Sequence, residues 1–375
     1  MTKHLMINGR NLAFTTGQTI LDVAKEYQIP IPTLCYLKDA TSIGRCGICA
    51  VEIEDEKELV LSCSAIADSS MKIKTESERV IKKRKTILAK FLSSGNHNCA
   101  IAESRGDKWS DFQLKVSKAD GTDELCPVWG ACRLQDLAYQ YQVDIDPDSC
   151  TQVVPLDPME LKNPLIVRDF SRCILCGRCV LACNEIQVNR AINLDESLGK
   201  VVTKGDKALI DSNCVFCGEC VQACPVGALV EKKARYIWRP WKSEKIRTTC
   251  PYCGVGCQQM LHIQDGKIVK VTGVEHAEPN RGRLCVKGRF GYDFIYSKDR
   301  LKTPLIKEKD EFREASWDEA LDLVADKFST IIKNHGPDAL AGVSCARSIN
   351  EDSYQMQKLF RAVFKTNNID HCART

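Results

Sequence analysis

The stretch Cys173-Ile-Leu-Cys176-Gly-Arg-Cys179-Val-Leu-Ala-Cys183 decides the fold of the middle of the chain, because its spacing recurs at Cys214-Val-Phe-Cys217-Gly-Glu-Cys220-Val-Gln-Ala-Cys224. Each copy has the pattern C-x2-C-x2-C-x3-C, and 30 residues separate the two copies. Thiols this close together suit a shared metal centre better than separate disulfide bridges. The repeat therefore predicts two neighbouring metal clusters.

This repeat resembles the bacterial two-cluster ferredoxins, in which the fourth cysteine of each motif binds the other cluster. The resemblance implies one [4Fe–4S] cluster held by Cys173, Cys176, Cys179 and Cys224. It implies a second [4Fe–4S] cluster held by Cys214, Cys217, Cys220 and Cys183. Neighbouring clusters suit conduction, because each holds one electron that can pass to the other. We expect residues 163–235 to form this domain.

The bulk composition agrees with metal-bound thiols. The chain has 375 residues, 22 cysteines and a formal net charge of +4. The cysteines stand in clusters and no apolar signal segment opens the sequence, so we expect reduced thiols in a cytoplasmic protein rather than a secreted disulfide framework. No apolar run approaches the ~20 residues that span a bilayer, so we expect no membrane span.

One basic run, Lys82-Lys83-Arg84-Lys85, raises the question of nucleic-acid binding. Apolar residues recur around this run at helical spacing, from Val80 to Leu92. We therefore interpret the run as the solvated face of an amphipathic helix and expect no nucleic-acid partner.

A different cysteine pattern lies near the N-terminus. Residues 3–14 predict a hairpin around Asn8-Gly9, and Thr19 with Asp22 predicts the start of a helix. The pattern C-x10-C-x2-C-x13-C follows, formed by Cys35, Cys46, Cys49 and Cys63. Four thiolates at one site suit a [2Fe–2S] cluster. A structural zinc site is the alternative, although zinc ribbons usually pair two C-x2-C knuckles and only one is present here.

This pattern resembles the β-grasp ferredoxin domain of the large iron–sulfur subunit of complex I, of many iron-only hydrogenases and of NAD(P)-linked formate dehydrogenases. The resemblance implies a β-grasp domain with one [2Fe–2S] cluster over residues 1–78. In these proteins a [4Fe–4S] cluster held by one histidine and three cysteines comes next, usually with the pattern H-x3-C-x2-C-x5-C.

The resemblance implies that this second cluster is held by His97, Cys99, Cys126 and Cys132. The final C-x5-C step matches, whereas one residue separates His97 from Cys99 and 26 residues separate Cys99 from Cys126. We expect a helical domain with an insertion over residues 79–162. The alternatives are a structural histidine and a degenerate site without a cluster.

A further cysteine set has a stretched pattern, formed by Cys250, Cys253, Cys257 and Cys285. It resembles the small N-terminal [4Fe–4S] domain of the molybdopterin oxidoreductases, which we expect over residues 236–300. In that family a lysine two residues after the last ligand lies between the cluster and the pterin, so the resemblance implies that Lys287 has this role. An ordinary surface lysine is the alternative.

Residues 301–375 resemble the start of the α/β catalytic part of the same family. Ser316 predicts a helix N-cap, and residues 339–344 predict a strand. The segment Asn367-Asn-Ile-Asp-His-Cys-Ala-Arg-Thr375 resembles the formate dehydrogenase segment that leads into a selenocysteine or cysteine metal ligand. We therefore expect no catalytic metal ligand up to Thr375. Our hypothesis is that residue 376 is selenocysteine, which the codon after Thr375 would test.

Three cysteines remain outside the predicted ligand sets, namely Cys150, Cys345 and Cys372. We expect Cys150 and Cys345 to be small buried apolar residues. We expect Cys372 to be structural, because it matches the Cys-Ala-Arg step of the formate dehydrogenase segment.

Together these patterns predict an α+β multidomain protein with one [2Fe–2S] cluster, three [4Fe–4S] clusters and a fourth at His97. The resemblance implies the electron-transfer portion of a formate dehydrogenase. Formate or carbon dioxide would react at a molybdenum or tungsten bis(molybdopterin guanine dinucleotide) site in the full-length protein. The partner would be a flavin- and NAD(P)-binding diaphorase subunit, a hydrogenase or a ferredoxin.

Several alternatives stay open on the sequence. They are a stand-alone iron–sulfur carrier, the large iron–sulfur subunit of a complex I-like NADH dehydrogenase, an iron-only hydrogenase and a molybdopterin enzyme acting on another oxyanion. The choice of metal, the direction of the reaction and the electron partner are also open.

Overall fold

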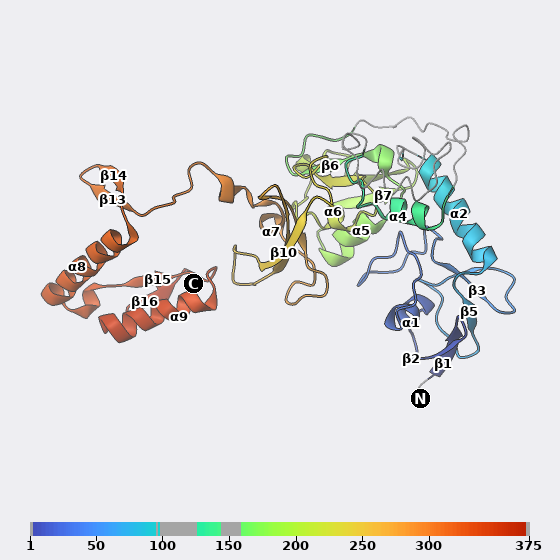
Figure 1. Cartoon of the computed structure of the whole chain (residues 1–375), viewed down its shortest axis with the longest axis horizontal. Helices are drawn as coiled ribbons and strands as arrows, with labels where there is room; N and C mark the ends of the chain where they lie inside the picture. Colours follow the sequence, from blue (N-terminus) through green and yellow to red (C-terminus); the bar gives the residue numbers. More distant parts are fainter. Residues whose placement is uncertain (1–2, 95–96, 98–125, 144–158, 373–375) are drawn as a thin grey trace. The chain divides into compact units, whose positions relative to one another are not determined.

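The computed structural model describes residues 3–94, 97, 126–143 and 159–372 (Figure 1). The chain divides into two compact units. Unit 1 comprises residues 1–245 and 262–270, and unit 2 comprises residues 246–261 and 271–375. No helix in the described ranges is long and apolar enough to cross a membrane.

Unit 1 begins with a five-stranded sheet in the order β2-β1-β5-β3-β4. Its strands are β1 Lys3–Ile7, β2 Arg10–Phe14, β3 Ala50–Ile53, β4 Val60–Leu61 and β5 Lys72–Lys74. β1 and β2 form the predicted hairpin, and Asn8 and Gly9 at its turn have φ angles of 49° and 78°. Both values lie in the left-handed region that a two-residue hairpin turn of this kind requires. β1 also pairs in parallel with β5, which completes a β-grasp sheet.

Helix α1 (Ile20–Glu26) packs its buried side chains into the same core as Leu5, Ile7 and Leu12. Its start is a capping box, as predicted. The Thr19 hydroxyl accepts from the Asp22 backbone N–H at 3.2 Å, and the Asp22 carboxylate accepts from the Thr19 N–H at 3.0 Å. The chain is thereby turned back across the sheet before it reaches Cys35.

Helices α2 (Glu78–Ser93) and α4 (Arg133–Gln140) pack against each other, and α2 also contacts β3 (Figure 1). Their shared core contains the buried side chains Leu88, Leu92, Leu134, Leu137, Cys126 and Cys132. The predicted amphipathic helix is confirmed, and its apolar stripe faces the cysteine-bearing loops.

The interpretation of the basic run as a solvated face is wrong at one position. Lys82, Lys83 and Lys85 are exposed, whereas Arg84 is completely buried. Its guanidinium donates to the carbonyls of Ile48 and Ala50 at 3.1 and 2.9 Å. Arg84 therefore lies on the packed face of α2 and ties it to the loop after Cys46.

Two short antiparallel strand pairs accompany the duplicated cysteine motif, one joining the chain before and after it and one between its two copies. β6 (Ile166–Arg168) pairs with β9 (Leu229–Glu231), and β7 (Ile192–Asp195) pairs with β8 (Lys200–Thr203), both antiparallel. The helical segments between them are η4 Phe170–Arg172, α5 Arg178–Leu181, the π-helical turn η5 Ala182–Ile186, η6 Leu209–Asp211 and α6 Glu219–Ala223. Each motif therefore places its third cysteine on a short helix, which α5 and α6 supply.

The next part of the chain forms a three-stranded sheet in the order β10-β11-β12. Its strands are β10 Glu244–Thr249, β11 Gln258–Gln264 and β12 Lys267–Gly273, and the short helices α7 (Val286–Phe290) and η7 (Asp293–Tyr296) follow. Cys250 and Cys257 lie at facing ends of β10 and β11, where the Cys250 N–H donates to the Cys257 carbonyl at 2.8 Å.

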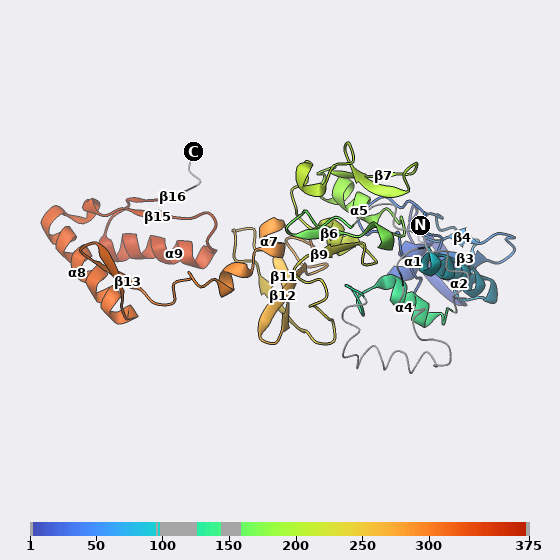
Figure 2. The same cartoon turned by 90° about the horizontal axis from the view of Figure 1, so that it is seen from above.

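The rest of unit 2 alternates helices and short strands. Its elements are β13 Leu305–Glu308, β14 Glu311–Glu314, α8 Trp317–His335, η8 Pro337–Ala339, β15 Gly342–Ser344, α9 Asn350–Lys358, η9 Leu359–Phe364 and β16 Ile369–His371. Ser316 caps α8 as predicted, by accepting from the Glu319 N–H at 3.1 Å. β15 pairs in parallel with β16 and contacts α9 (Figure 2).

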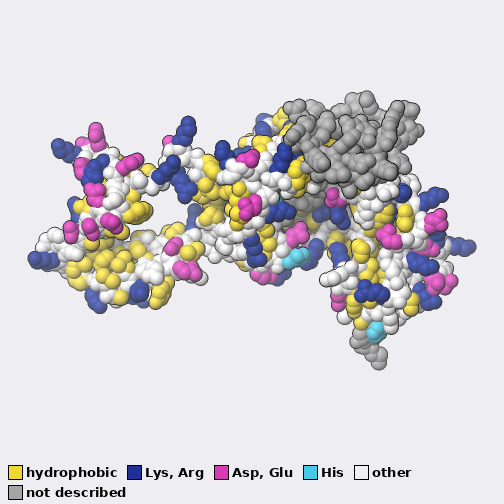
Figure 3. Space-filling model, in the orientation of Figure 1, with side chains coloured by type: hydrophobic (Ala, Val, Ile, Leu, Met, Phe, Trp, Pro, Cys, Tyr) yellow, Lys and Arg dark blue, Asp and Glu magenta, His cyan; other side chains and the backbone are white. Residues whose placement is uncertain are grey.

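Helix α8 keeps its apolar stripe exposed within the described residues. Trp317 and Leu321 are 68% and 59% exposed, and hydrophobic side chains gather on this part of unit 2 in Figure 3. The described residues of unit 2 therefore do not bury this face of the helix.

Candidate iron–sulfur sites

The four predicted ligands near the N-terminus are all buried, namely Cys35, Cys46, Cys49 and Cys63. Gly44 and Gly47 flank Cys46 with φ angles of 59° and 74°, where a side chain would be strained. The backbone N–H of Cys46 donates to Cys35 Sγ at 3.4 Å. The tight loop thus turns a backbone donor toward a thiol sulfur, as a cluster-binding loop requires.

Hydrogen bonds between thiols connect these cysteines in pairs. The Cys35 thiol lowers the pKa of Cys46 to about 6, and the Cys49 thiol lowers the pKa of Cys63 to about 6. The same hydrogen bonds, together with burial, raise the pKa of Cys35 and of Cys49. Because metals bind the thiolate form, this environment already favours ionised sulfur at two of the four positions.

Three predicted ligands of the second site fall on described residues, and Cys99 lies outside them. Cys132 is the N-cap residue of α4, and Cys126 is buried in the same core. His97 is only 5% exposed, and its Nε2 atom has no hydrogen-bond partner in the part of the chain that the structure describes. Burial, and then the nearby Arg172, lower the pKa of His97 to about 4.

An unpaired buried ring nitrogen is costly unless a ligand satisfies it. A neutral imidazole near Arg172, which itself donates to Cys126 Sγ, together with the buried thiols of Cys126 and Cys132, provides donors of the kind that an iron–sulfur cluster with mixed ligation needs. The described residues of this site therefore fit such a cluster.

A buried arginine joins this second site to the duplicated motif. Arg172 Nη1 donates to Cys126 Sγ at 3.6 Å, and Arg172 directly precedes Cys173. The backbone N–H of Arg133, next to Cys132, donates to the carbonyl of Pro225 at 2.8 Å. The sequence analysis did not identify Arg172, because a basic residue beside a cysteine motif is too common to be a signal.

The electrostatics of the duplicated motif follow the crossed arrangement. Burial raises the pKa of Cys176 to about 12, with Cys224 as the next cause, and it raises the pKa of Cys173 to about 11, with a further contribution from Cys224. Burial also raises the pKa of Cys214, with contributions from Cys217 and Cys183. Each fourth cysteine therefore lies near the first cysteines of the other motif.

A cavity lies among the thiols of the first set. It is lined by Cys173, Cys176, Cys179, Cys220 and Cys224, and otherwise mostly by apolar side chains. In the described ranges no three His, Cys, Asp or Glu side chains converge on a position for a single metal ion. The thiolates of a cluster bind different iron atoms and stand further apart, so the residues around this cavity fit a cluster.

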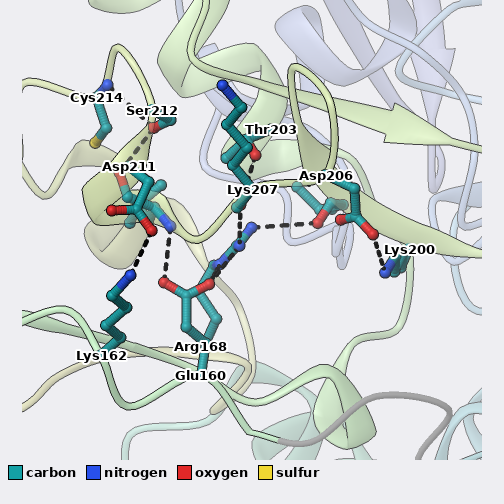
Figure 4. Close-up of polar contacts among 12 residues, drawn as sticks. Glu160, Lys162, Arg168, Lys200, Thr203, Asp206, Lys207, Asp211, Ser212 and Cys214 are labelled. Carbon is teal, nitrogen blue, oxygen red and sulfur yellow. Dashed lines mark hydrogen bonds and ion pairs between the residues drawn. The ribbon is translucent and has the colours of Figure 1, made fainter.

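A buried polar network supports the loop that leads into Cys214 (Figure 4). Arg168 Nε donates to Glu160 Oε2 at 2.8 Å, and the other Glu160 oxygen accepts from the Leu209 N–H at 2.9 Å. Ser212 then accepts from the Cys214 N–H at 3.2 Å. This ion pair, which the sequence analysis missed, fixes the chain between β8 and the second motif.

The loop before Cys46 also reaches the duplicated motif. Thr41 N–H donates to Glu185 Oε2 at 2.7 Å, and Arg45 pairs with Glu196 at 2.8 Å. A Cβ atom at Gly177 would lie 2.8 Å from Ile43 Cδ1, and Gly177 has a φ angle of 77°. The N-terminal site and the site of Cys176 and Cys179 are therefore neighbours.

We expect Gly177→Ala to weaken this junction. The left-handed backbone costs roughly 1–2 kcal/mol with a side chain, and the methyl group would also collide with Ile43. The measurement is the thermal loss of visible cluster absorption in the variant and in Gly177→Ala/Ile43→Ala. The double variant should regain only the stability that the collision with Ile43 costs, and not the part that the left-handed backbone costs. A double variant that loses its absorption at the same temperature as Gly177→Ala would contradict the contact with Ile43.

The last predicted site lies within unit 2. Burial raises the pKa of Cys250 and of Cys257, and Cys253 and Cys285 contribute to both. Cys285 is the N-cap residue of α7. A Cβ at Gly288 would lie 3.4 Å from Cys250 Sγ, so this glycine lets α7 approach the thiol. The four cysteines are therefore electrostatic neighbours.

Lys287 lies on α7 beside this site. Its Nζ atom is 5.6 Å from the centre of the Tyr252 ring, and its charge partly opposes the rise in the pKa of Cys250 that burial causes. Its role toward a pterin stays a prediction.

The expectation that Cys345 is a buried apolar residue is wrong. Cys345 and Cys372 are both exposed, and their Sγ atoms lie 3.6 Å apart at the ends of β15 and β16. The two-stranded pair leaves its strand ends uncovered in the described part of unit 2, which explains the exposure. Cys150 lies outside the described residues.

Four segments match known protein families. Residues 3–78 match the 2Fe-2S iron-sulfur cluster binding domain, and residues 172–228 match the 4Fe-4S dicluster domain. Residues 243–297 match the molybdopterin oxidoreductase Fe4S4 domain, and residues 300–375 match molybdopterin oxidoreductase. This chain joins iron–sulfur electron-transfer domains to molybdopterin oxidoreductase domains. The predicted fold class and the cofactor classes of these domains are confirmed.

Two curated relatives align with almost the whole of this chain. The "NADPH-Fe(3+) oxidoreductase subunit alpha" of Geobacter sulfurreducens is 34% identical over 99% of this chain and 40% of its own length. A Staphylococcus aureus protein named "Putative formate dehydrogenase" is 31% identical over 100% of this chain and 39% of its own length. The chain thus spans about two fifths of the length of these relatives.

A solved structure shares the fold. The "Crystal structure of NAD+-reducing [NiFe]-hydrogenase in the H2-reduced state" matches with a TM-score of 0.51 at 24% identity, over 63% of this chain and 90% of that one. At this identity the likeness supports the fold alone.

Proposed function

We propose that this chain provides the iron–sulfur sites for electron transfer between a molybdenum or tungsten pterin site that interconverts formate and carbon dioxide and a flavin-containing NAD(P) subunit. The observation that carries the proposal is the direct contact between candidate sites in unit 1. Arg172 joins Cys126 to the motif that begins at Cys173, and the Thr41 N–H of the N-terminal loop donates to Glu185, just after that motif.

The cysteines of the predicted ligand sets, with His97, would hold the clusters, which supply one-electron transfer when bound. Within unit 1 the chain's own residues bury or half-bury the thiols and keep the sites adjacent. Arg84 and the Glu160–Arg168 pair fix the loops that carry Cys49 and Cys214. The abundance of thiols for metal ligation suits a reducing compartment, and we propose the cytoplasm.

The choice of formate rests on the Asn367–Arg374 segment and on the relative named as a putative formate dehydrogenase. A second candidate function comes from the relative named as an NADPH-Fe(3+) oxidoreductase subunit, which is slightly more similar. In that case NADPH would be the electron donor and an oxidised metal species the acceptor. A hydrogenase or a ferredoxin in place of the flavin subunit is a further possible partner.

Reduction of the clusters by each donor tests the proposal. We expect formate to bleach the visible absorption of the anaerobic full-length protein, purified with its partner subunits. Cys250→Ser should abolish reduction of the [2Fe–2S] signal by formate, because electrons from the pterin would enter through unit 2. NADPH with the partner subunit should still reduce that signal in the same variant.

Two outcomes would contradict the formate proposal. Reduction by NADPH but not by formate in the unaltered protein would favour the second candidate function. Formate reduction that survives Cys250→Ser would show that electrons enter the chain elsewhere.

A further inference from the structure

Arg172 is placed in an unusual way between two candidate sites of unit 1. Its side chain is buried, with 4% exposed, and its Nη1 atom donates to Cys126 Sγ at 3.6 Å. Its charge also acts on His97, the predicted histidine ligand of the same site. Arg172 therefore brings a permanent positive charge to a ligand sulfur.

A buried carboxylate holds this arginine in place. Asp169 is 5% exposed, and its Oδ2 atom accepts from Arg172 Nε at 3.2 Å. The other oxygen, Oδ1, accepts from the Ser171 N–H at 3.2 Å, which caps the turn η4. A Cβ at Gly227 would lie 3.5 Å from Arg172 Cδ, so the arginine stem packs along the chain after Cys224. The guanidinium is thus aimed at Cys126 from a fixed support.

The neighbouring buried arginine has a different set of partners. Arg168 donates to Glu160 and, at 3.4 Å, to the carbonyls of Val201 and Lys207. Arg168 therefore binds a carboxylate and backbone carbonyls, whereas Arg172 directs one of its donors to a thiol sulfur.

We propose that Arg172 raises the reduction potential of the cluster held at His97, Cys126 and Cys132, and that Asp169 moderates this effect. Adding an electron makes a cluster more negative, so a hydrogen bond to a ligand sulfur and a nearby positive charge stabilise the reduced state. A carboxylate beside the arginine opposes that stabilisation. The inference rests on the proposed cluster at this site and deepens the proposed electron-transfer function.

The test is a potentiometric titration of the full chain, prepared anaerobically and followed by electron paramagnetic resonance. His97→Cys identifies the signal of this site, because exchange of the ligand alters it. We expect Arg172→Gln to shift the midpoint potential of that signal to a lower value. We expect Asp169→Asn to shift it to a higher value, because the guanidinium then acts without its counter-charge.

Opposite shifts are the result that a merely structural pair would not produce. No shift, or shifts in the same direction, would overturn the proposal. Arg178→Gln is the matched control, because the charge of Arg178 acts on Cys176 and Cys224 of the neighbouring site. This control should leave the potential of the His97 signal unchanged, and a shift there equal to that of Arg172→Gln would also overturn the proposal.

If Arg172→Gln loses iron from this site, the midpoint potential of the His97 signal in Arg172→Lys tests the proposal instead. Lysine keeps the charge but cannot donate to both Asp169 and Cys126 in the same way, so we expect a smaller shift to lower potential. An unchanged potential in Arg172→Lys would overturn the proposal. Failure of the underlying cluster is distinguishable, because His97→Cys would then alter no signal in the otherwise unaltered protein.

Discussion

Replacing Cys224 with serine is expected to remove iron from the site of Cys173, Cys176 and Cys179, although Cys224 belongs to the other motif in the sequence. Cys224 raises the pKa of Cys173 and Cys176 through its charge, and it lines the same cavity. Loss of one [4Fe–4S] cluster would lower the iron content by roughly four atoms per chain. Iron analysis and electron paramagnetic resonance of the anaerobic protein measure this loss.

Matched variants distinguish the crossed arrangement from a linear one. In the crossed arrangement Cys224→Ser and Cys173→Ser both lose the cluster of Cys173 and retain the signal of the cluster of Cys214. Cys183→Ser and Cys214→Ser both lose the cluster of Cys214 and retain the signal of the cluster of Cys173. In a linear arrangement Cys173→Ser would instead match Cys183→Ser. That second pairing of spectra would refute the assignment of the fourth cysteines.

The duplicated motif could be predicted from sequence because its geometry is local. Leu175 and Gly177 have φ angles of 52° and 77°, and Phe216 and Gly218 repeat them at 53° and 75°. Leu175 N–H donates to Cys173 Sγ and Phe216 N–H donates to Cys214 Sγ, both at 3.4 Å. The same short spacing therefore forms the same loop twice, without help from distant residues.

The buried arginines could not be predicted in this way. Arg84 stands in a run of exposed lysines, and its burial depends on partners elsewhere in the chain, among them the carbonyls of Ile48 and Ala50, more than thirty residues earlier. Arg168 and Arg172 likewise depend on partners brought by the fold, such as the sulfur of Cys126. Helical periodicity describes a single helix, and it contains no information on which distant carbonyl will accept a hydrogen bond from that helix.

The site of His97 could be predicted from the sequence only in part. The spacing from Cys126 to Cys132 is local and matches the resemblance, whereas the step from His97 to Cys99 departs from it. The added observation is the unpartnered Nε2 atom of a buried His97 among described residues. The sequence spacing left a structural histidine and a degenerate site open as alternatives. The buried Nε2 atom without a hydrogen-bond partner favours a histidine that binds a cluster.

Arg84→Ala is expected to destabilise the N-terminal part of unit 1 by about 2–5 kcal/mol, because it leaves two buried carbonyls without donors. Arg84 also donates to Tyr141 Oη at 2.7 Å and pairs with Glu76 at 2.5 Å. These bonds join α2, the loop of Ile48 and the end of α4. The measurement is the temperature at which the [2Fe–2S] absorption is lost, compared with that of the unaltered protein.

Lys85→Ala provides the control on the same helix, because Lys85 is the next residue and is exposed. A surface change of this kind usually alters stability by less than about 0.5 kcal/mol. Arg84→Lys should fall between the two, since one ammonium cannot replace a planar guanidinium that donates to both carbonyls and to Tyr141. If Arg84→Ala lost its cluster at the same temperature as Lys85→Ala, burial of the guanidinium would not be what holds the loop in place.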